Sequence, residues 1–320
     1  MSFDILGTGS RVPRKVVTND DLTEFLDTSD EWIYTRTGIR KRHVLTDETL
    51  LDLAVGSAET ALEDAKTSPA EIGFVLAATM RGDTVTPSFA FCVAEKLGIA
   101  APAFDVNAAC VGVLYCMELA DSLIATGKAD KILIVSAEAM SKLVDWNDRA
   151  SCVLFGDGSG AMVVGKGEGR LAGVLSGKPD SVSIRMPSFE GESRFSEIAA
   201  EKMVMHMDGQ EVYKFAVNAM GHEIENVCQK AGIEPAEVDW FLPHQANVRI
   251  VDACQKKFKI EKSKVLMNIA EYGNMSATSI MVLLDEFAKK GTFHRGDKLL
   301  FVAFGGGLTS GAVLIKWNKD

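Results

Sequence analysis

The sequence predicts a layered α/β fold made of two similar halves. Apolar stretches of strand length alternate with helical stretches, as at residues 74–78 and 131–135 early in the chain and at 299–303 near its end. This alternation is typical of parallel or mixed sheets covered by helices. At 320 residues the chain also exceeds the usual size of one domain, so two fused units are expected.

Two internal similarities indicate that the halves arose by duplication. Residues 68–76 read SPAEIGFVL and residues 234–242 read EPAEVDWFL, which match in kind at almost every position. In the same way, VLFGDG at 153–158 is echoed by VAFGGG at 302–307. Self-similarity over long separations is a signature of repeated architecture. We therefore divide the chain into an N-terminal half, 1–168, and a C-terminal half, 169–320.

The first half contains a candidate nucleophile, Cys110. A strand-like segment at 103–106 leads through a turn of small residues to a helix that should begin at or next to Cys110, and residues 111–117 are almost all apolar. A helix of this composition is buried in its first two turns. The N–H groups of a first turn stabilise a thiolate, so we expect a lowered pKa for Cys110. A free cysteine is also a common core residue, so this assignment depends on the groups that the fold brings to Cys110.

The repeat offset identifies those groups. Applied to Cys110, the offset between residues 68 and 234 gives Ser276, in the turn 272–277 that also contains Asn274. The loop after the repeated strand of the second half contains His244. Cys110, His244 and Asn274 thus lie at strand ends of one duplicated core, and this convergence predicts an active site.

Composition narrows the possible partners and location. The formal net charge is −10, which argues against general affinity for nucleic acid or an anionic membrane. No apolar run approaches the roughly 18 residues of a membrane span, and the first residues lack the pattern of a secretory signal. Six scattered cysteines with no CxxC spacing argue against disulfides and thiolate metal sites. We expect a cytoplasmic protein without a metal site.

Four motifs closely resemble the beta-ketoacyl-acyl-carrier-protein synthase III family, the initiating condensing enzymes of type II fatty acid synthesis in the thiolase superfamily. They are DVNAAC at 105–110, PHQAN at 243–247, GN at 273–274 and FGGG at 304–307. The resemblance covers nearly the whole chain and includes TSDEW at 28–32 and TRTGIR at 35–40. It implies a thiolase-like, five-layered α-β-α-β-α fold, a homodimer, and a catalytic triad of Cys110, His244 and Asn274.

The resemblance also implies a reaction. Cys110 would attack the thioester of an acyl-CoA primer, with the oxyanion held by the backbone N–H groups of Cys110 and Gly306. Malonyl-acyl-carrier protein would then lose carbon dioxide, and its enolate would attack the acyl-enzyme while His244 and Asn274 stabilise the enolate oxygen. No metal or organic cofactor is implied.

Binding residues follow from the same resemblance. The adenine of CoA would lie between Trp32 and Arg149, near Thr28, with Arg36 toward a phosphate. The other assigned residues are Gly209, Tyr213, Ala246, Asn247 and Ile250 along the pantetheine arm, and Lys214, Arg249, Lys256 and Lys257 for docking of the acidic carrier protein. An ordinary solvated helix face is the alternative interpretation of that basic group.

Three positions depart from the family pattern and leave the primer open. Thr86 stands where enzymes restricted to acetyl primers tend to carry a phenylalanine at the floor of the acyl pocket, contributed across the dimer. Val113 replaces an aromatic residue often found there, and Met275 replaces the usual threonine after Asn274. We therefore expect Thr86 to permit primers longer than acetyl.

Alternative functions differ in how they fit these residues. A thiolase would be expected to carry a second cysteine where this chain has Ala303, and an elongating synthase would carry a histidine in place of Asn274. A specialised starter or acyl-transfer role in a secondary pathway remains open. A catalytically silent acyl-binding or carrier-binding subunit is disfavoured by the intact set of Cys110, His244 and Asn274.

Overall fold

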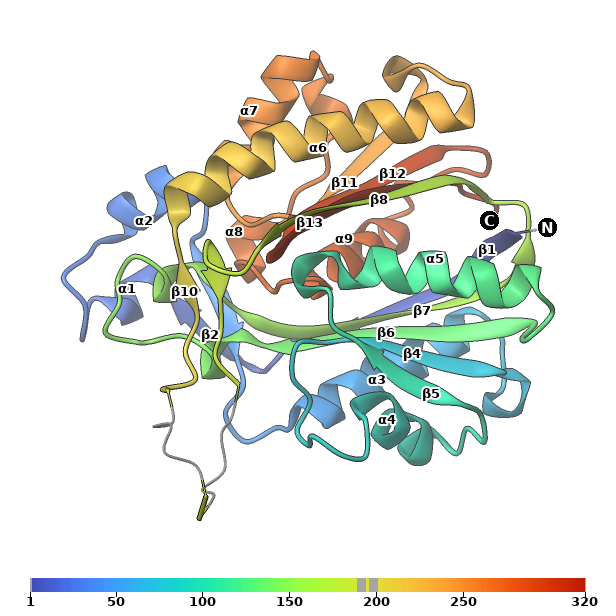
Figure 1. Ribbon diagram of the computed structural model, residues 1–320, viewed down its shortest axis with the longest axis horizontal. Coiled ribbons are helices and arrows are strands. Elements are labelled where there is room, and N and C mark those ends of the chain that lie inside the picture. Colours follow the sequence, from blue (N-terminus) through green and yellow to red (C-terminus); the bar gives the residue numbers. More distant parts are fainter. Residues whose placement is uncertain (1, 189–193, 196–200, 320) are drawn as a thin grey trace.

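Two mixed β-sheets, separated by a layer of helices and covered by helices on both outer faces, form the protein (Figure 1). The structure is a computed structural model that describes residues 2–188, 194–195 and 201–319. Two helices cover the outside of each sheet, α3 (Leu50–Asp64) and α4 (Phe89–Leu97) on one and α6 (Gly209–Ala231) and α7 (Val248–Phe258) on the other. Helices α5 (Gly112–Ala125) and α9 (Thr278–Lys289) lie between the sheets. The predicted five-layered α-β-α-β-α fold is confirmed.

The larger sheet has the strand order β1-β7-β6-β4-β5. Strand β4 is parallel to β5 and β6, whereas β7 is antiparallel to β1 and β6. The bounds are β1 Ser2–Arg11, β4 Phe74–Ala78, β5 Ala103–Val106, β6 Lys131–Ala139 and β7 Asp157–Gly167. The parallel strands β4 and β6 are almost entirely buried, as expected for strands covered on both faces.

The smaller sheet has the strand order β11-β12-β13-β8. Strands β11 and β12 are parallel, and the other two pairs are antiparallel. The bounds are β8 Arg170–Asp180, β11 Trp240–Pro243, β12 Lys298–Gly305 and β13 Gly307–Lys316. All strands of the larger sheet thus precede residue 169, and all strands of the smaller sheet follow it.

The repeated sequence motifs adopt the same local structure in both sheets. Each PAE motif forms a 3₁₀ turn, η1 (Pro69–Glu71) or η5 (Pro235–Glu237), directly ahead of β4 or β11. In both turns the side chain of the last glutamate accepts a hydrogen bond from the backbone N–H of the residue that precedes the proline. The same capping chemistry therefore begins an equivalent strand in each half.

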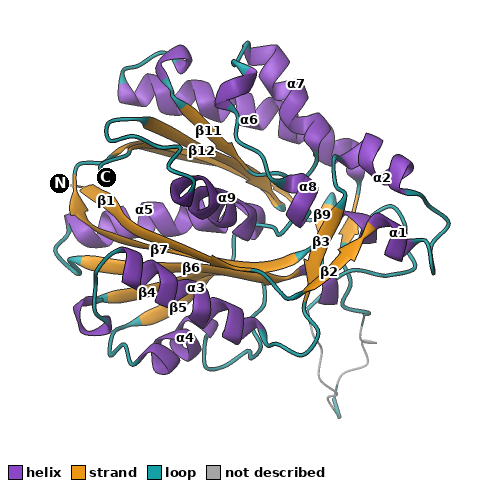
Figure 2. Ribbon diagram, turned by 180° about the vertical axis from the view of Figure 1, so that it is seen from behind, coloured by secondary structure: helices purple, strands orange, loops and turns teal. Residues whose placement is uncertain are grey.

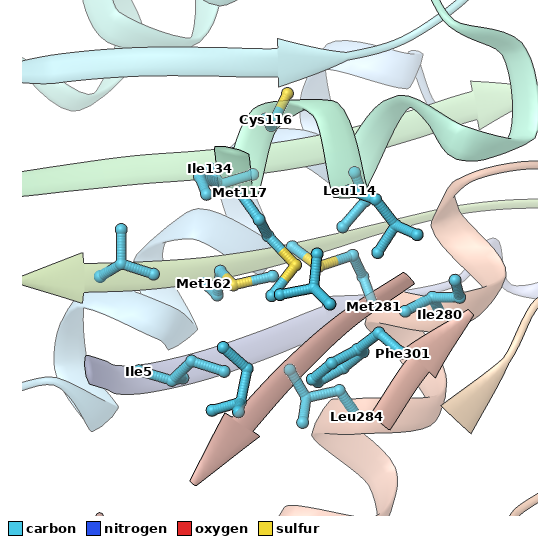
Figure 3. Close-up of a cluster of buried hydrophobic side chains, with 14 of the residues drawn as sticks. Ile5, Leu114, Cys116, Met117, Ile134, Met162, Ile280, Met281, Leu284 and Phe301 are labelled. Carbon is cyan, nitrogen blue, oxygen red and sulfur yellow. The ribbon is translucent and has the colours of Figure 1, made fainter. Parts of the chain in front are cut away.

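The central layer joins the two halves through one hydrophobic core. Figure 3 shows Leu114 and Met117 of α5, Ile280 and Leu284 of α9 and Phe301 of β12 gathered between the sheets. All five side chains are fully buried. Because helices of both halves share this core, the division at residue 168 remains a proposal about the sequence repeat rather than a boundary between separately packed units.

Short elements close one end of the molecule, opposite the end where the two termini lie (Figure 2). They include the hairpin of β2 and β3, the helices α1, α2 and α8, and the strand pair β9 and β10. Their bounds are β2 Lys15–Thr18, α1 Asn19–Leu22, α2 Asp30–Thr37, β3 Lys41–Val44, β9 Ile184–Arg185, β10 His206–Met207 and α8 Ile269–Tyr272. Further 3₁₀ turns are η2 Ala109–Val111, η3 Met140–Lys142, η4 Cys152–Leu154 and η6 Lys262–Lys264.

No helix in the described ranges is long and apolar enough to cross a bilayer. The same residues contain no cluster of three or more histidine, cysteine or acidic side chains arranged to hold a metal ion.

Candidate active site

Cys110 lies in a tight turn between the end of β5 and the start of α5. The α-helix begins at Gly112, two residues later than the predicted start, and Cys110 occupies the 3₁₀ turn ahead of it. The preceding residue, Ala109, has φ 45°, in the left-handed region that non-glycine residues rarely adopt. A β-carbon at Gly305 would lie 2.9 Å from the Cys110 nitrogen, so only glycine allows the end of β12 to approach the turn this closely.

The electrostatics of Cys110 differ from the prediction. The pKa of the Cys110 thiol is raised to about 11, mainly by burial and also by the nearby Glu138 side chain, while a hydrogen bond from Ser276 offsets part of this rise. That hydrogen bond runs from Ser276 Oγ to Cys110 Sγ at 3.6 Å. The predicted lowering of the pKa was wrong for the resting protein, because loss of solvation outweighs the stabilisation offered by the first helical turn.

His244 follows β11 and is buried, with its backbone N–H donating to Val302 O at 2.7 Å. Its ring lies edge-on to Phe304, with the ring centroids 5.3 Å apart. Burial lowers the pKa of His244 to about 4, and the backbone of Ser276 opposes this shift only in part. Within the described part of the chain, neither ring nitrogen has a hydrogen-bond partner. His244 is therefore a neutral imidazole that lies near the Ser276 backbone without a well-formed hydrogen bond to it.

Asn274 is held by backbone contacts on both sides. Its N–H donates to Leu154 O at 2.8 Å, and its carbonyl accepts from the Gly156 N–H at 3.1 Å. Its side-chain Oδ1 accepts from the Ser276 N–H at 2.8 Å. That last hydrogen bond engages the amide oxygen, so the NH₂ group is the donor that the side chain can offer to a ligand.

Ser276 connects the three residues predicted to form the triad. Its hydroxyl contacts Cys110, its N–H holds Asn274 and its backbone influences the titration of His244. Ser276 is also the residue that the repeat offset placed opposite Cys110. The structure brings the predicted residues together around it.

A cavity of about 630 Å³ leads from the surface to Asn274. Most of the residues assigned to CoA line it, namely Trp32, Arg36, Gly209, Tyr213, Ala246, Asn247 and Ile250. Lys214 and Arg249 of the basic group line it as well. Thr28, Arg149, Cys110 and His244 are not among the lining residues, so Asn274 is the one member of the predicted triad that lines the cavity.

The predicted adenine position is closed in this structure. The Arg149 guanidinium lies 4.8 Å from the Trp32 ring centroid, and the Arg36 guanidinium lies 4.5 Å from it. A flat ring needs about 3.5–4 Å of separation on each face. Arg149 also donates to the Asp27 carbonyl and lies 3.7 Å from the Asp27 carboxylate. An adenine could enter between Trp32 and Arg149 only after Arg149 moves.

Thr86 is not brought to the triad within one chain. It is exposed, next to Val85, whose exposure is 91%. Lys256 and Lys257 lie on α7 outside the cavity lining, and Lys257 Nζ donates to Asn218 Oδ1 of α6 at 2.9 Å. The assignments of Thr86, Lys256 and Lys257 remain predictions.

Sequence reasoning missed Glu138, which is buried close to Cys110. A signal was present, because Glu138 is the one charged residue between Lys131 and Lys142 in an otherwise apolar or small-residue stretch. A carboxyl group in a strand buried on both faces is costly and therefore informative.

Comparisons with known proteins agree with this picture. The family described as 3-oxoacyl-[acyl-carrier-protein (ACP)] synthase III matches residues 104–180, and its C-terminal counterpart matches residues 228–317. The chain is 45% identical over 334 residues to the beta-ketoacyl-[acyl-carrier-protein] synthase III of Desulfitobacterium hafniense, with 100% of this chain and 99% of that protein covered.

Two solved structures show the same fold. The 3-oxoacyl-[acyl-carrier-protein] synthase III of Aquifex aeolicus superposes with a TM-score of 0.92 at 42% identity, covering 98% of this chain and 100% of that one. The priming beta-ketosynthase of the R1128 polyketide biosynthetic pathway has a TM-score of 0.92 at 31% identity, covering 99% and 97%. The full-length identity to these proteins shows that the chain belongs to the beta-ketoacyl-[acyl-carrier-protein] synthase III family of acyltransferase-type condensing enzymes.

Proposed function

We propose that the protein condenses an acyl-CoA primer with malonyl-acyl-carrier protein and so initiates fatty acid synthesis. The product is a beta-ketoacyl-acyl-carrier protein, and the intermediate is an acyl group on Cys110. The observation that carries the proposal is the meeting of Cys110, His244 and Asn274 around Ser276, with Asn274 in the lining of a cavity of about 630 Å³.

In the first half-reaction, Cys110 Sγ attacks the carbonyl carbon of the acyl-CoA thioester. The bond between that carbon and the CoA sulfur breaks, and CoA leaves as the thiol after taking up a proton. The backbone N–H groups of Cys110 and Gly306 hold the oxyanion. The close approach of Gly305 to the Cys110 nitrogen supports this assignment, because it places the glycine segment of β12 beside the Cys110 amide.

In the second half-reaction, the malonyl thioester loses carbon dioxide and becomes an enolate, which attacks the acyl carbon and releases the Cys110 thiolate. His244 and Asn274 donate hydrogen bonds to the enolate oxygen. The low pKa of His244, about 4, supports this role, because a neutral imidazole donates one N–H without giving up a proton. The reaction draws on no metal or organic cofactor.

The lining of the cavity supports binding of the CoA arm there, and the basic side chains on the flanking helices support docking of an acidic carrier protein. Tyr213 and Asn247 line the cavity, and Lys214 and Arg249 lie on the flanking helices α6 and α7. Lys256 is exposed on α7, one of these two flanking helices. Lys214 Nζ is paired with Glu211 Oε1 at 2.7 Å. Basic side chains on a chain of net charge −10 favour docking of an acidic partner at this position.

The protein acts as a cytoplasmic homodimer in this proposal. Strand β5 is an edge of the larger sheet and has an exposed aromatic side chain, Phe104 at 38%. Phe91 and Val85 are exposed nearby in the chain. Pairing of β5 edges would cover these side chains and bring Thr86 of one subunit to the acyl pocket of the other.

The test is a condensation assay with a panel of acyl-CoA primers and malonyl-acyl-carrier protein. We expect a stable acyl adduct on Cys110 by intact-protein mass spectrometry, followed by beta-ketoacyl product when malonyl-acyl-carrier protein is added. Absence of both with every primer would refute the proposal.

A second candidate is a specialised starter enzyme of a secondary pathway. The similarity to the priming beta-ketosynthase of the R1128 pathway and the small side chain of Thr86 favour it. Strong preference for a bulky primer together with a carrier protein of a polyketide pathway, measured in the same assay, would support this candidate over the first.

A further inference from the structure

A carboxyl group that the proposed reaction does not use lies beside the nucleophile. Glu138 is near the end of β6 and has an exposure of 1%. Its Oε1 accepts a hydrogen bond from the Met80 N–H at 3.2 Å. Its Oε2 is buried and, within the described residues, has no partner. No cation of the described chain neutralises this side chain.

A carboxylate in this position is unstable because burial without a counter-ion strongly disfavours the charged form. Burial raises the pKa of Glu138 to about 8, and the hydrogen bond from Met80 together with the nearby Ser276 hydroxyl offsets only part of that shift. At neutral pH Glu138 is mainly a carboxylic acid. Since Oε1 accepts from Met80, the proton belongs on Oε2, which makes Oε2 a donor.

The groups around Glu138 show where that donor is directed. The Ser276 hydroxyl interacts with Glu138 and also donates to Cys110 Sγ at 3.6 Å. The titratable groups that interact with Glu138 are the Cys110 thiol ahead of α5 and the Asp157 carboxyl of β7. Asp157 already accepts from Ser141 and Leu45, so its oxygens are occupied. Ser276 is the group that links Glu138 to the sulfur.

We propose that Glu138 is a positioning residue that acts as a neutral acid, donating its Oε2 proton to Ser276 Oγ so that the Ser276 hydroxyl donates to Cys110 Sγ. The hydrogen bonds strengthen as negative charge develops on the sulfur, and no proton changes its owner along the chain. A buried neutral acid of this kind can serve as a hydrogen-bond donor in an apolar site. The inference rests on Cys110 as the proposed nucleophile.

The sign of the pH dependence follows from the charge on Glu138. At a pH below the pKa of Glu138, the side chain is a neutral donor and supports the thiolate through Ser276. At a pH above that pKa, Glu138 is negatively charged, and its charge raises the pKa of Cys110. The reactivity of Cys110 should therefore rise less steeply with pH above about 8 than that of an isolated thiol.

The experiment measures the alkylation rate of Cys110 by iodoacetamide between about pH 6 and pH 10, with the modified peptide quantified by mass spectrometry. Glu138→Gln keeps a donor but cannot titrate, so we expect a decrease of about threefold at neutral pH and loss of the alkaline break. Glu138→Leu and Ser276→Ala remove the donor chain and should each slow alkylation about tenfold or more. Alkylation of the double variant, which combines Glu138→Leu with Ser276→Ala, should be no slower than alkylation of either single variant.

A matched control is Glu223→Gln, because Glu223 is equally buried but is bonded to Ser310 of β13 at 2.8 Å. It should leave the alkylation profile unchanged. Retention of the alkaline break in Glu138→Gln, with near-UV circular dichroism unchanged, would overturn the inference.

The alkylation assay also separates this inference from the proposed function. If acyl-CoA never labels Cys110 but alkylation depends on Glu138 as described, the proposed function fails and the role of Glu138 stands.

Discussion

The turn that carries Cys110 and the turn that carries Asn274 and Ser276 occupy equivalent places, each ahead of a helix of the central layer. Each turn contains one non-glycine residue in the left-handed region, with φ 45° at Ala109 and 53° at Ser276. The first turn presents a thiol, and the second presents a hydroxyl and an amide. One repeated scaffold thus supplies the candidate nucleophile from one half and hydrogen-bonding groups from the other.

The glycine segment of each half packs against the turn of the other half. Gly305, in the second half, lies against Cys110 of the first half, whereas Gly156, in the first half, lies against the turn of Asn274 in the second. A β-carbon at Gly156 would lie 2.3 Å from the Tyr272 carbonyl oxygen. Each half therefore completes the functional turn of the other.

The residue after each of these glycines shows where the halves diverge. Asp157 accepts hydrogen bonds from the Leu45 and Ser141 N–H groups and from the Ser141 hydroxyl, so its side chain fastens neighbouring loops. Gly306 has no side chain, and a β-carbon there would lie 3.3 Å from Ile184 and 3.7 Å from Ala109. The first segment thus has a structural role that depends on its side chain, whereas the second offers only backbone groups beside the Cys110 turn.

The largest expected effect is on the nucleophile itself. Cys110→Ser should reduce acyl-enzyme formation more than about a thousandfold, because a serine hydroxyl ionises even less readily than the buried thiol. Intact-protein mass spectrometry after incubation with acyl-CoA measures the adduct. Cys92→Ser, at a partly buried cysteine far from the turn in sequence, is the control and should acylate normally. Full acylation of Cys110→Ser would assign the nucleophile elsewhere.

The two supporting glycines should affect different half-reactions. The added methyl group of Gly305→Ala would clash with Cys110 and should slow acyl transfer about a hundredfold. The added methyl group of Gly156→Ala would clash with the turn that carries Asn274 and should mainly slow malonyl decarboxylation. Separate assays of the two half-reactions make the comparison. Gly177→Ala, where an added β-carbon meets nothing within 4 Å, is the control. The crossed arrangement would be refuted by equal losses in both assays for both variants.

The triad donors come next in size. His244→Ala and Asn274→Ala should each slow the malonyl half-reaction by roughly a hundredfold and leave acyl transfer much less affected, since both side chains are assigned to the enolate oxygen. The rate of carbon dioxide release, measured against the rate of Cys110 acylation, decides this. Equal loss in the two steps would move these residues into the acyl-transfer step.

The smallest effect concerns primer choice. A phenylalanine in place of Thr86 would fill the space that longer primers occupy. Because each CH₂ of the primer buried there contributes roughly 0.8 kcal/mol of binding free energy, selectivity between acetyl and butyryl or branched primers should shift by tens-fold. The measurement is kcat/KM for each primer with Thr86→Phe and with the parent. A parent that uses acetyl-CoA alone, or a variant that loses all primers equally, would show that Thr86 is not the pocket floor.

The sequence by itself determined the elements, the repeat and the candidate residues of the site. The alternating strands and helices and the two PAE segments are local patterns, and local hydrogen bonds and apolar periodicity suffice to fix them. Even one long-range contact could be predicted, because the repeat offset placed Ser276 opposite Cys110, and the two side chains touch.

Only the tertiary structure decided the electrostatics and the free space. The pKa of Cys110 depends on how much water reaches the sulfur, and that is set by segments as distant as β6 and β12, so burial reversed a prediction made from the helix start alone. In the same way, the hydrogen bond from Arg149 to Asp27 holds the Arg149 guanidinium over the Trp32 ring. Glu138 can influence the site only because the fold brings its strand close to Ser276. Desolvation and van der Waals exclusion arise from contacts between residues far apart in the chain, and no local pattern encodes them.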